Sequence, residues 1–210
     1  MKENDDNKWS DYTADYLYQI IQVYRDHANE FFIQPNGVEY LPEGIVFKDN
    51  LHGNAKELYT VAYNLKPESV LECGCGGCYH LKNLSIILPA TYINGFDITL
   101  YQLNFGKWFS QLLKEIEDRL FVMDFTKRTT TQQYEFVFTQ AVIMHLSSDN
   151  GIKAMQNMKK MSSKYIFMIE NPNHHGGIEN WTKMVNEVFG DCDITRPSQY
   201  ISHAILITKR

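Results

Sequence analysis

The sequence predicts an α/β domain built on a mostly parallel sheet, with helices covering both of its faces. Two observations support this prediction. After residue 66 the chain alternates between short apolar runs, typical of buried strands, and amphipathic stretches of helical period. A glycine-rich stretch at residues 69–83 (SVLECGCGGCYHLKN) joins the first such strand to the first helix that follows it. Strands that alternate with helices favour parallel pairing, because parallel neighbours need long crossover connections.

The segment before the sheet is expected to be helical and then irregular. Apolar residues recur at helical spacing over residues 9–32, which are rich in tyrosine, and Ser10 is a candidate N-cap. Residues 33–52 carry two prolines and two glycines, so they are predicted to form a loop with a short strand near Val46. A second helix is predicted over residues 55–65, just before the first strand of the sheet.

The remaining elements are expected in a regular order. After the first strand, marked by the apolar run Val70 and Leu71, the predicted strands are residues 92–96, 120–123, 134–139 and 164–169, and the predicted helices are residues 81–87, 103–116, 149–161 and 178–189. Two closing strands, residues 192–195 and 201–208, are expected to form an edge hairpin. Neither a repeat nor a linker indicates a second domain. We therefore assign residues 1–66 to an N-terminal helical lid and loop, in the same domain as a core formed by residues 67–210.

Composition limits the possible functions. With 210 residues, 44% of them hydrophobic, the chain can bury one large core. The formal net charge of −5 argues against nucleic acid as a partner. No apolar run approaches the roughly 18 residues that span a bilayer, and the polar N-terminus lacks the features of a signal peptide, so we expect a cytoplasmic protein without a membrane partner. Three of the four cysteines lie within residues 73–78, which fits a reducing compartment better than a disulfide framework.

Acidic residues follow three successive strands of the predicted sheet. Ligands of such sheets bind beyond the carboxyl ends of the strands, where the glycine loop also exposes backbone N–H groups. Glu72 precedes Gly74 by two positions, and its charge would repel a pyrophosphate but favour a ligand that carries an ammonium and a sulfonium. Asp97 lies roughly 20 residues past the glycines, at a position where a carboxylate can accept hydrogen bonds from both hydroxyls of a ribose. Asp124, followed by Phe125, can accept from an exocyclic amine of adenine or simply cap a turn.

This combination resembles the class I methyltransferases that depend on S-adenosylmethionine (SAM). The resemblance rests on ECGCGGC at residues 72–78, on the two aspartates at the following strand ends and on the closing hairpin, and it covers about residues 69–210. It implies an enzyme with a Rossmann-like three-layer sandwich, a seven-stranded sheet of order 3-2-1-4-5-7-6, and SAM as cofactor. The residues implied to bind SAM are Glu72, Gly74 and Gly76 at its methionine part, Asp97 at the ribose, Asp124 and Phe125 at the adenine, and Cys75, Ile98 and Gln140 as further contacts. Cys78 stands where the family has a third glycine, which leaves the contacts at residues 77 and 78 open.

A narrower resemblance concerns the second half of the sheet. FTQAVIMHLSSD at residues 138–149 and SSKYIFMIEN at residues 162–171 are similar to small methyltransferases of bacterial surface-glycan and nonulosonic-acid gene clusters. This similarity implies an O-methyltransferase of surface-glycan, and thus polysaccharide, biosynthesis. Its small-molecule acceptor would be a sugar or a phosphate or phosphoramidate-type group.

His145 is the candidate general base for methyl transfer. It follows the fourth strand of the core by a few residues, and imidazole titrates near neutral pH. The alternative is a loop histidine that caps or packs, and an acceptor that is already anionic needs no base. Residues 170–177 (ENPNHHGG) are expected to form a polar rim around the acceptor. The candidate acceptor-binding residues are Tyr12, Tyr16, His145, Glu170, Asn171 and His174.

Several alternatives remain open at this point. Cys73, Cys75, Cys78 and His80 are residue types that bind zinc or iron–sulfur clusters, but their close spacing favours small buried side chains, and no metal is expected. A metal site at Glu170, His174 and His175 is likewise disfavoured, because adjacent histidines usually point apart. The rival functions are a nicotinamide or nucleotide-binding oxidoreductase and a non-catalytic SAM-binding partner protein. The acceptor atom and the oligomeric state are not specified by the sequence.

Overall fold

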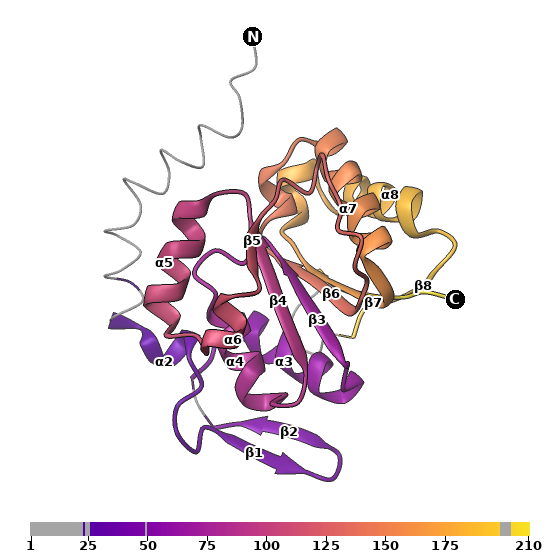
Figure 1. The fold of residues 1–210 in the computed structure, drawn as a ribbon. Helices are drawn as coiled ribbons and strands as arrows, with labels where there is room; N and C mark the ends of the chain where they lie inside the picture. Colours follow the sequence, from indigo (N-terminus) through magenta and orange to yellow (C-terminus); the bar gives the residue numbers. More distant parts are fainter. Residues whose placement is uncertain (1–22, 24–25, 49, 198–202) are drawn as a thin grey trace.

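The fold is that of a computed structural model, which describes residues 23, 26–48, 50–197 and 203–210 (Figure 1). Its centre is a seven-stranded sheet of order β5-β4-β3-β6-β7-β9-β8. The strands are β3 (Ser69–Cys73), β4 (Tyr92–Asp97), β5 (Leu120–Val122), β6 (Tyr134–Gln140), β7 (Ser162–Ile169), β8 (Asp193–Thr195) and β9 (Ala204–Thr208). All neighbours pair in parallel except β9, which is antiparallel to both β7 and β8. Counted from β3, the order is 3-2-1-4-5-7-6, so the predicted topology is confirmed.

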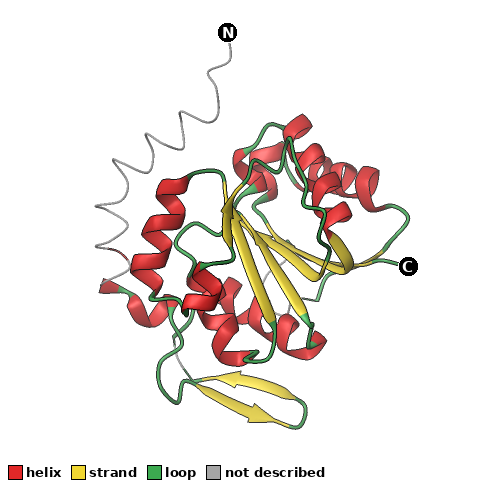
Figure 2. Cartoon of the chain, viewed as in Figure 1, coloured by secondary structure: helices red, strands yellow, loops and turns green. Residues whose placement is uncertain are grey.

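Helices lie on both faces of the sheet (Figures 1 and 2). The α-helices are α2 (Ala28–Phe31), α3 (Gly53–Leu65), α4 (Tyr79–Ile87), α5 (Leu100–Ser110), α6 (Lys114–Glu117), α7 (Ser148–Met161) and α8 (Ile178–Phe189). Two short 3-10 helices, η1 (Ile143–His145) and η2 (Pro172–His175), follow β6 and β7. The predicted α/β layering is therefore confirmed.

Two hydrophobic cores separate the layers. Because successive residues of a strand point to opposite faces, Val70 packs in the core that contains side chains of α3 and α4, whereas Leu71 packs in the core that contains side chains of α7 and α8. Ile33 and Ile45, from the segment before the sheet, belong to the first of these cores. The described part of that segment therefore shares a core with the sheet.

Two predicted elements were wrong in detail. Residues 103–116 form two helices rather than one, because Gln111 adopts a left-handed conformation (φ 46°) that ends α5. Residues 33–52 hold a complete hairpin, β1 (Val38–Leu41) and β2 (Gly44–Phe47), where a loop with a single short strand was predicted. The proline in the middle of this segment lies in the two-residue turn, where its missing N–H leaves the pairing of the strands intact.

Some predictions fall outside the described residues. Most of the predicted helix over residues 9–32 does so, including Tyr12 and Tyr16, and so do residues 201 and 202 of the closing hairpin. Ile33, the residue directly after the predicted helix over residues 9–32, is tied to α4, because its N–H donates to Asn83 Oδ1 (3.0 Å). Among the described residues, no helix has the length and apolar character needed to cross a membrane.

Candidate active site

The glycine loop between β3 and α4 follows a tight path. Gly74 (φ 77°) and Gly76 (φ 44°) both adopt positive φ angles, which glycine tolerates without a steric penalty. The N–H groups of Gly74 and Cys75 both donate to the Phe96 carbonyl, each at 2.9 Å, so the loop folds back over the end of β4. A Cβ on Gly74 would lie 2.6 Å from Val142 Cγ2. Gly74 is therefore required for both its conformation and its close approach to the loop after β6.

Cys78 occupies the position of the third glycine and adopts a left-handed conformation too (φ 58°). Its fully buried side chain fits because α5 carries Gly106 opposite it: a Cβ on Gly106 would collide with Cys78 Sγ and lie 2.7 Å from the Gly76 carbonyl oxygen. Cys78 Sγ also lies 3.7 Å from Cys75 Sγ. The loop thus keeps a left-handed residue at this position, and a glycine distant in sequence makes room for its side chain.

A cavity of about 350 Å³ lies beyond the carboxyl ends of β3, β4 and β6. Its lining brings together every residue that the sequence predicted for SAM: Glu72, Gly74, Cys75, Gly76, Asp97, Ile98, Asp124, Phe125 and Gln140. His145 lines the same cavity from the loop after β6. The residues predicted to bind the cofactor and the candidate base therefore line the same cavity.

Two of the acids are held by hydrogen bonds. Asp97 is buried and accepts the Gly76 N–H at Oδ2 (3.0 Å) and the Thr99 N–H at Oδ1 (3.3 Å). Burial raises the pKa of Asp97, and these backbone donors only partly oppose it.

Asp124 accepts the Thr126 N–H (2.9 Å) and pairs with Lys127 Nζ (2.8 Å). Partial burial would raise the pKa of Asp124, but the Lys127 and Thr126 donors outweigh it and the pKa is lowered. Asp124 thus caps a turn, the alternative left open by the sequence, and also lines the cavity.

The deepest polar groups of the cavity lack partners. Among the described residues, five buried side-chain polar atoms accept or donate no hydrogen bond, and three of them are Glu72 Oε2, His80 Nε2 and Gln140 Oε1 from the cavity lining. Burial, followed by the nearby Cys78 and Asp97, raises the pKa of Glu72 well above its usual range. A buried polar atom without a partner is costly, so a cluster of them is typical of a ligand site. Sequence reasoning considered His80 only as a metal ligand and missed its place in this wall.

The loop after β6 is positioned by Glu170. This buried carboxylate accepts the Val142 N–H at Oε1 (3.2 Å) and the Met144 N–H at Oε2 (3.0 Å), so it fixes the short helix that ends at His145. Burial raises the pKa of Glu170 to about 7, against the effect of these backbone donors. Glu170, predicted as an acceptor-binding residue, therefore also supports the candidate base. The signal for this second role was only its place at the end of a strand.

The remaining rim residues are divided between different positions. Glu170 and Asn171 line a second, more open cavity of about 710 Å³ that also touches Ala141. The His174 ring lies 6.0 Å from the His145 ring, centroid to centroid. His175 is buried, and its Nε2 lies 3.0 Å from the Ile143 carbonyl oxygen. The two adjacent histidines thus have different environments, as their sequence positions suggested.

The cysteines are divided between the two faces of the sheet. Cys73 packs in the core that contains α7 and α8, whereas Cys75 and Cys78 pack in the core that contains α3 and α4. His80 Nδ1 is 2.8 Å from the Tyr59 hydroxyl. Across the part of the chain that the structure describes, no three His, Cys, Asp or Glu side chains are grouped so that they could hold a metal ion.

Comparisons with known proteins agree with the fold. No family model matches the sequence, and no curated protein matches it. Solved structures do match: the plantazolicin methyltransferase BpumL in complex with S-adenosylhomocysteine (SAH) aligns with a TM-score of 0.59 and 14% identity, over 74% of this chain and 83% of that one. The chain has the class I methyltransferase fold.

Two further structures with this fold show how varied the acceptors of such proteins are. Magnesium protoporphyrin IX methyltransferase from Synechocystis PCC 6803, with bound SAM, aligns with a TM-score of 0.55 and 12% identity, over 75% of this chain and 78% of that one. The N-methyltransferase NodS from Bradyrhizobium japonicum WM9, in complex with SAH, aligns with a TM-score of 0.54 and 12% identity, over 74% and 83%. At these identities the similarity establishes the class I methyltransferase fold, and function rests on the site.

Proposed function

We propose that this chain is a SAM-dependent methyltransferase that acts on a small polar acceptor. The observation that carries the proposal is the charge of the cavity: Glu72, Asp97 and Asp124 line it, and its lining among the described residues includes neither lysine nor arginine. The pyrophosphate of a nicotinamide dinucleotide would meet three carboxyl groups there, whereas the ammonium and sulfonium of SAM suit them. This charge disfavours the rival oxidoreductase.

The unpartnered buried atoms fit SAM as well. Glu72 Oε2 and Gln140 Oε1 are acceptors, which an ammonium group satisfies. We assign Asp97 to the ribose hydroxyls, and Asp124 with Phe125 to the adenine. SAM supplies an electrophilic methyl group when bound. The neighbours crystallised with SAM or SAH, among them BpumL and NodS, support this choice of cofactor.

The loop after β6 is proposed to handle the acceptor. His145, held in place through Glu170, accepts the proton of the acceptor hydroxyl as the methyl group is transferred. An acceptor that is already anionic requires no such step. Residues 1–66 are proposed to act as a lid that excludes water from the reaction, with Tyr12 and Tyr16, which lie outside the described residues, against the acceptor.

We further propose a sugar, or a phosphate or phosphoramidate-type group, as the acceptor in surface-glycan biosynthesis. The resemblance of residues 138–149 and 162–171 supports this choice. The second cavity offers compatible residue types, because its lining includes asparagines such as Asn54 and Asn171, together with Arg196 and Glu170. Amides bind hydroxyls, and a guanidinium binds anionic oxygens.

Calorimetry with SAM, SAH and NAD tests the cofactor assignment. We expect SAM and SAH to bind and NAD not to bind, because only NAD places phosphates against the three acids. Binding of NAD without SAM would overturn the proposal. Methyl transfer to candidate sugar acceptors, followed by mass spectrometry, then separates an enzyme from a non-catalytic SAM-binding protein, since a partner protein would bind SAM and transfer nothing on its own.

His145→Ala tests the proposed base. We expect kcat to fall about 100-fold or more, since general-base catalysis typically contributes that much, while the affinity for SAH stays within about twofold. His174→Ala is the matched comparison, because the His174 ring lies beside His145 but is absent from the cavity lining. As a candidate acceptor-binding residue it should change KM for the acceptor rather than kcat. An unchanged kcat in His145→Ala would contradict a base at this position and favour an acceptor that is already ionised.

A further inference from the structure

A buried chain of hydrogen bonds leads from the backbone of the N-terminal segment to the cofactor cavity. It begins at the Ile33 N–H, which donates to Asn83 Oδ1 at 3.0 Å. The Asn83 amide nitrogen lies 2.7 Å from the Tyr59 hydroxyl, which in turn lies 2.8 Å from His80 Nδ1. The Tyr59, His80 and Asn83 side chains are all buried. The series of hydrogen bonds ends at His80, which lines the cavity and whose Nε2 atom has no partner of good hydrogen-bond geometry.

This series of hydrogen bonds fixes the tautomer of His80. Because Asn83 Oδ1 accepts a backbone N–H, the other atom of the amide must be the nitrogen, which donates to Tyr59 and to the Phe31 carbonyl (2.6 Å). The Tyr59 hydroxyl, having accepted from Asn83, gives its single proton to His80 Nδ1. Nδ1 is therefore the acceptor nitrogen, and the proton of the neutral ring lies on Nε2.

The ring is neutral at any physiological pH. Burial lowers the pKa of His80 to about 3, and the hydrogen-bonding effect of the adjacent Gln140 side chain opposes this only in part. Burial also raises the pKa of Tyr59 well above its usual range, so the hydroxyl proton that defines the tautomer is retained. His80 thus presents one fixed N–H donor to the cavity and no positive charge.

The cavity wall therefore combines one donor with two acceptors. His80 Nε2–H is the donor, and Glu72 Oε2 and Gln140 Oε1 are the acceptors; none of the three makes a hydrogen bond of good geometry, although the Gln140 side chain lies close enough to His80 to raise its pKa. A ligand that offers an acceptor to His80 and a donor to Glu72 and Gln140 satisfies all three, as the carboxylate and ammonium of an α-amino acid can. His80 is also the second residue of α4, so an anion beside it lies at the positive end of a nine-residue helix.

We propose that His80, its tautomer fixed by Tyr59 and Asn83, donates its Nε2–H to the α-carboxylate of the bound cofactor. The inference rests on the proposed function and extends it, because it assigns a binding residue to the amino-acid end of SAM that the glycine motif and the strand-end acids do not provide. Glu72 and Gln140 then receive the ammonium group. The Tyr59 and Asn83 side chains act through His80 as positioning residues.

The test compares two ligands that differ only in the carboxylate: SAH and its decarboxylated analogue. In His80→Phe, which keeps a ring and removes the donor, we expect the affinity for SAH to fall about 30-fold, while the affinity for the decarboxylated analogue stays within about twofold. Tyr59→Phe removes the group that fixes the tautomer and should lower the affinity for SAH about fivefold with the same selectivity. Equal losses for both ligands would overturn the inference, because a merely structural role predicts no selectivity.

Two controls keep the outcomes distinct. Nitrogen-15 spectra of the histidine ring in the wild-type chain should show the Nε2–H tautomer, and a proton on Nδ1 would overturn the inference whatever the affinities. If His80→Phe does not fold, Tyr59→Phe alone decides, since its selectivity for SAH is expected and its absence contradicts the proposal. Failure of the wild-type chain to bind SAH would overturn the proposed function itself. Wild-type binding with an unchanged affinity in His80→Phe would overturn only this inference.

Discussion

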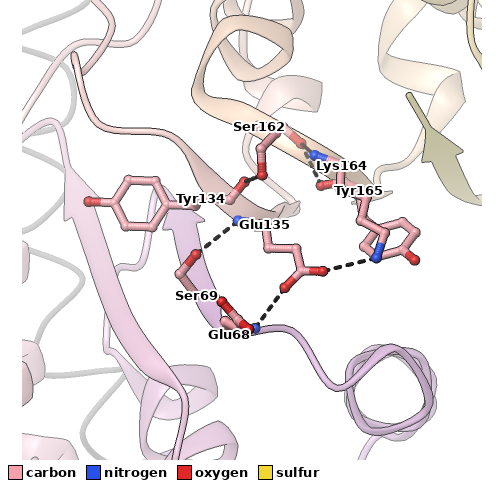
Figure 3. Close-up of polar contacts among 8 residues, drawn as sticks. Glu68, Ser69, Tyr134, Glu135, Ser162, Lys164 and Tyr165 are labelled. Carbon is pink, nitrogen blue, oxygen red and sulfur yellow. Dashed lines mark hydrogen bonds and ion pairs between the residues drawn. The ribbon is translucent and has the colours of Figure 1, made fainter. Parts of the chain in front are cut away.

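The two ends of the parallel strands differ in whether their polar groups have hydrogen-bond partners. At the amino end, side chains and backbone satisfy one another (Figure 3). The Glu135 carboxylate accepts the Glu68 N–H (2.8 Å) and pairs with Lys164 Nζ (3.1 Å), and Ser69 Oγ accepts the Glu135 N–H (3.0 Å). These contacts join the starts of β3, β6 and β7. At this end, polar residues stabilise the alignment of neighbouring strands.

At the carboxyl end, buried polar atoms are left without partners and the backbone is strained. Glu72 Oε2 and Gln140 Oε1 belong to the first group. Cys78 (φ 58°) and Ala141 (φ 55°) belong to the second, because a residue with a Cβ rarely adopts a positive φ. Lys66 and Gln111 (both φ 46°) adopt this conformation at the ends of α3 and α5, so the unpartnered polar atoms, and not the positive φ angles, distinguish the two ends of the sheet. Both features cost stability in the absence of a ligand. The difference indicates that one end of the sheet is adapted to folding and the other to binding.

Glu72→Gln is expected to have the largest effect on this comparison. The substitution removes the carboxyl group that is proposed to receive the ammonium group, so the affinity for SAH at about pH 8 should fall about 100-fold by calorimetry. The unliganded chain should at the same time become more stable, because a buried group that is costly to ionise has been removed. Asp97→Asn serves as the matched comparison for the stability change only, because Asp97 is a neighbouring acid whose carboxylate, unlike Glu72 Oε2, has backbone donors.

The pH dependence of this variant gives an independent check. The pKa of Glu72 is raised in the folded chain, so its favourable contribution to folding is present below the ordinary carboxylic range and is lost as pH rises through the folded-state pKa. The stability gain of Glu72→Gln, measured by urea denaturation, should therefore grow with pH above about 4. A gain that does not change with pH would show that Glu72 is not the source of the cost.

The fold, and the set of residues that line the first cavity, could be predicted because local patterns determine them. The alternation of strands and helices, the glycines at 74 and 76, and the acids at 72 and 97 are all readable in sequence order. They lie together because parallel strands end at the same edge of the sheet. The Cys78 departure could be noted, but not explained, since Gly106 is 28 positions away and lies opposite it only in the folded chain.

The acceptor half could not be predicted to the same degree, because its groups depend on contacts between distant segments. Glu170 turns back to the loop after β6, a relation that no spacing reveals. The same limit applies at the cofactor end, because the proposed role of His80 depends on Tyr59 and Asn83, and through the latter on the backbone at Ile33. Hydrogen-bond chains of this kind become visible only when the packing is known.

Gly106→Ala tests the strained end of the sheet. The added Cβ collides with Cys78 Sγ and with the Gly76 carbonyl, so the free energy of unfolding should fall by about 2 kcal/mol, as is typical of overpacking. Combined with Cys78→Gly, which removes the first collision and the positive-φ side chain, the loss should be partly recovered. Additive losses in the double variant would contradict the proposed compensation between the two positions. Urea denaturation of the four chains measures this coupling.

Glu135→Gln is expected to have the smallest effect and completes the comparison at the amino end. The Glu68 N–H, followed by Lys164, lowers the pKa of Glu135, so its contribution to stability is present above the ordinary carboxylic range and is lost as pH falls through the folded-state pKa. Because a glutamine oxygen can still accept the N–H and the ion pair is partly exposed, the loss near neutral pH should be less than about 1 kcal/mol. The loss should shrink in acid, opposite in sign and in pH trend to Glu72→Gln, with the affinity for SAH unchanged. A weakened affinity for SAH would contradict the division of roles between the two ends, because Glu135 lies at the end of the strands away from the cavity.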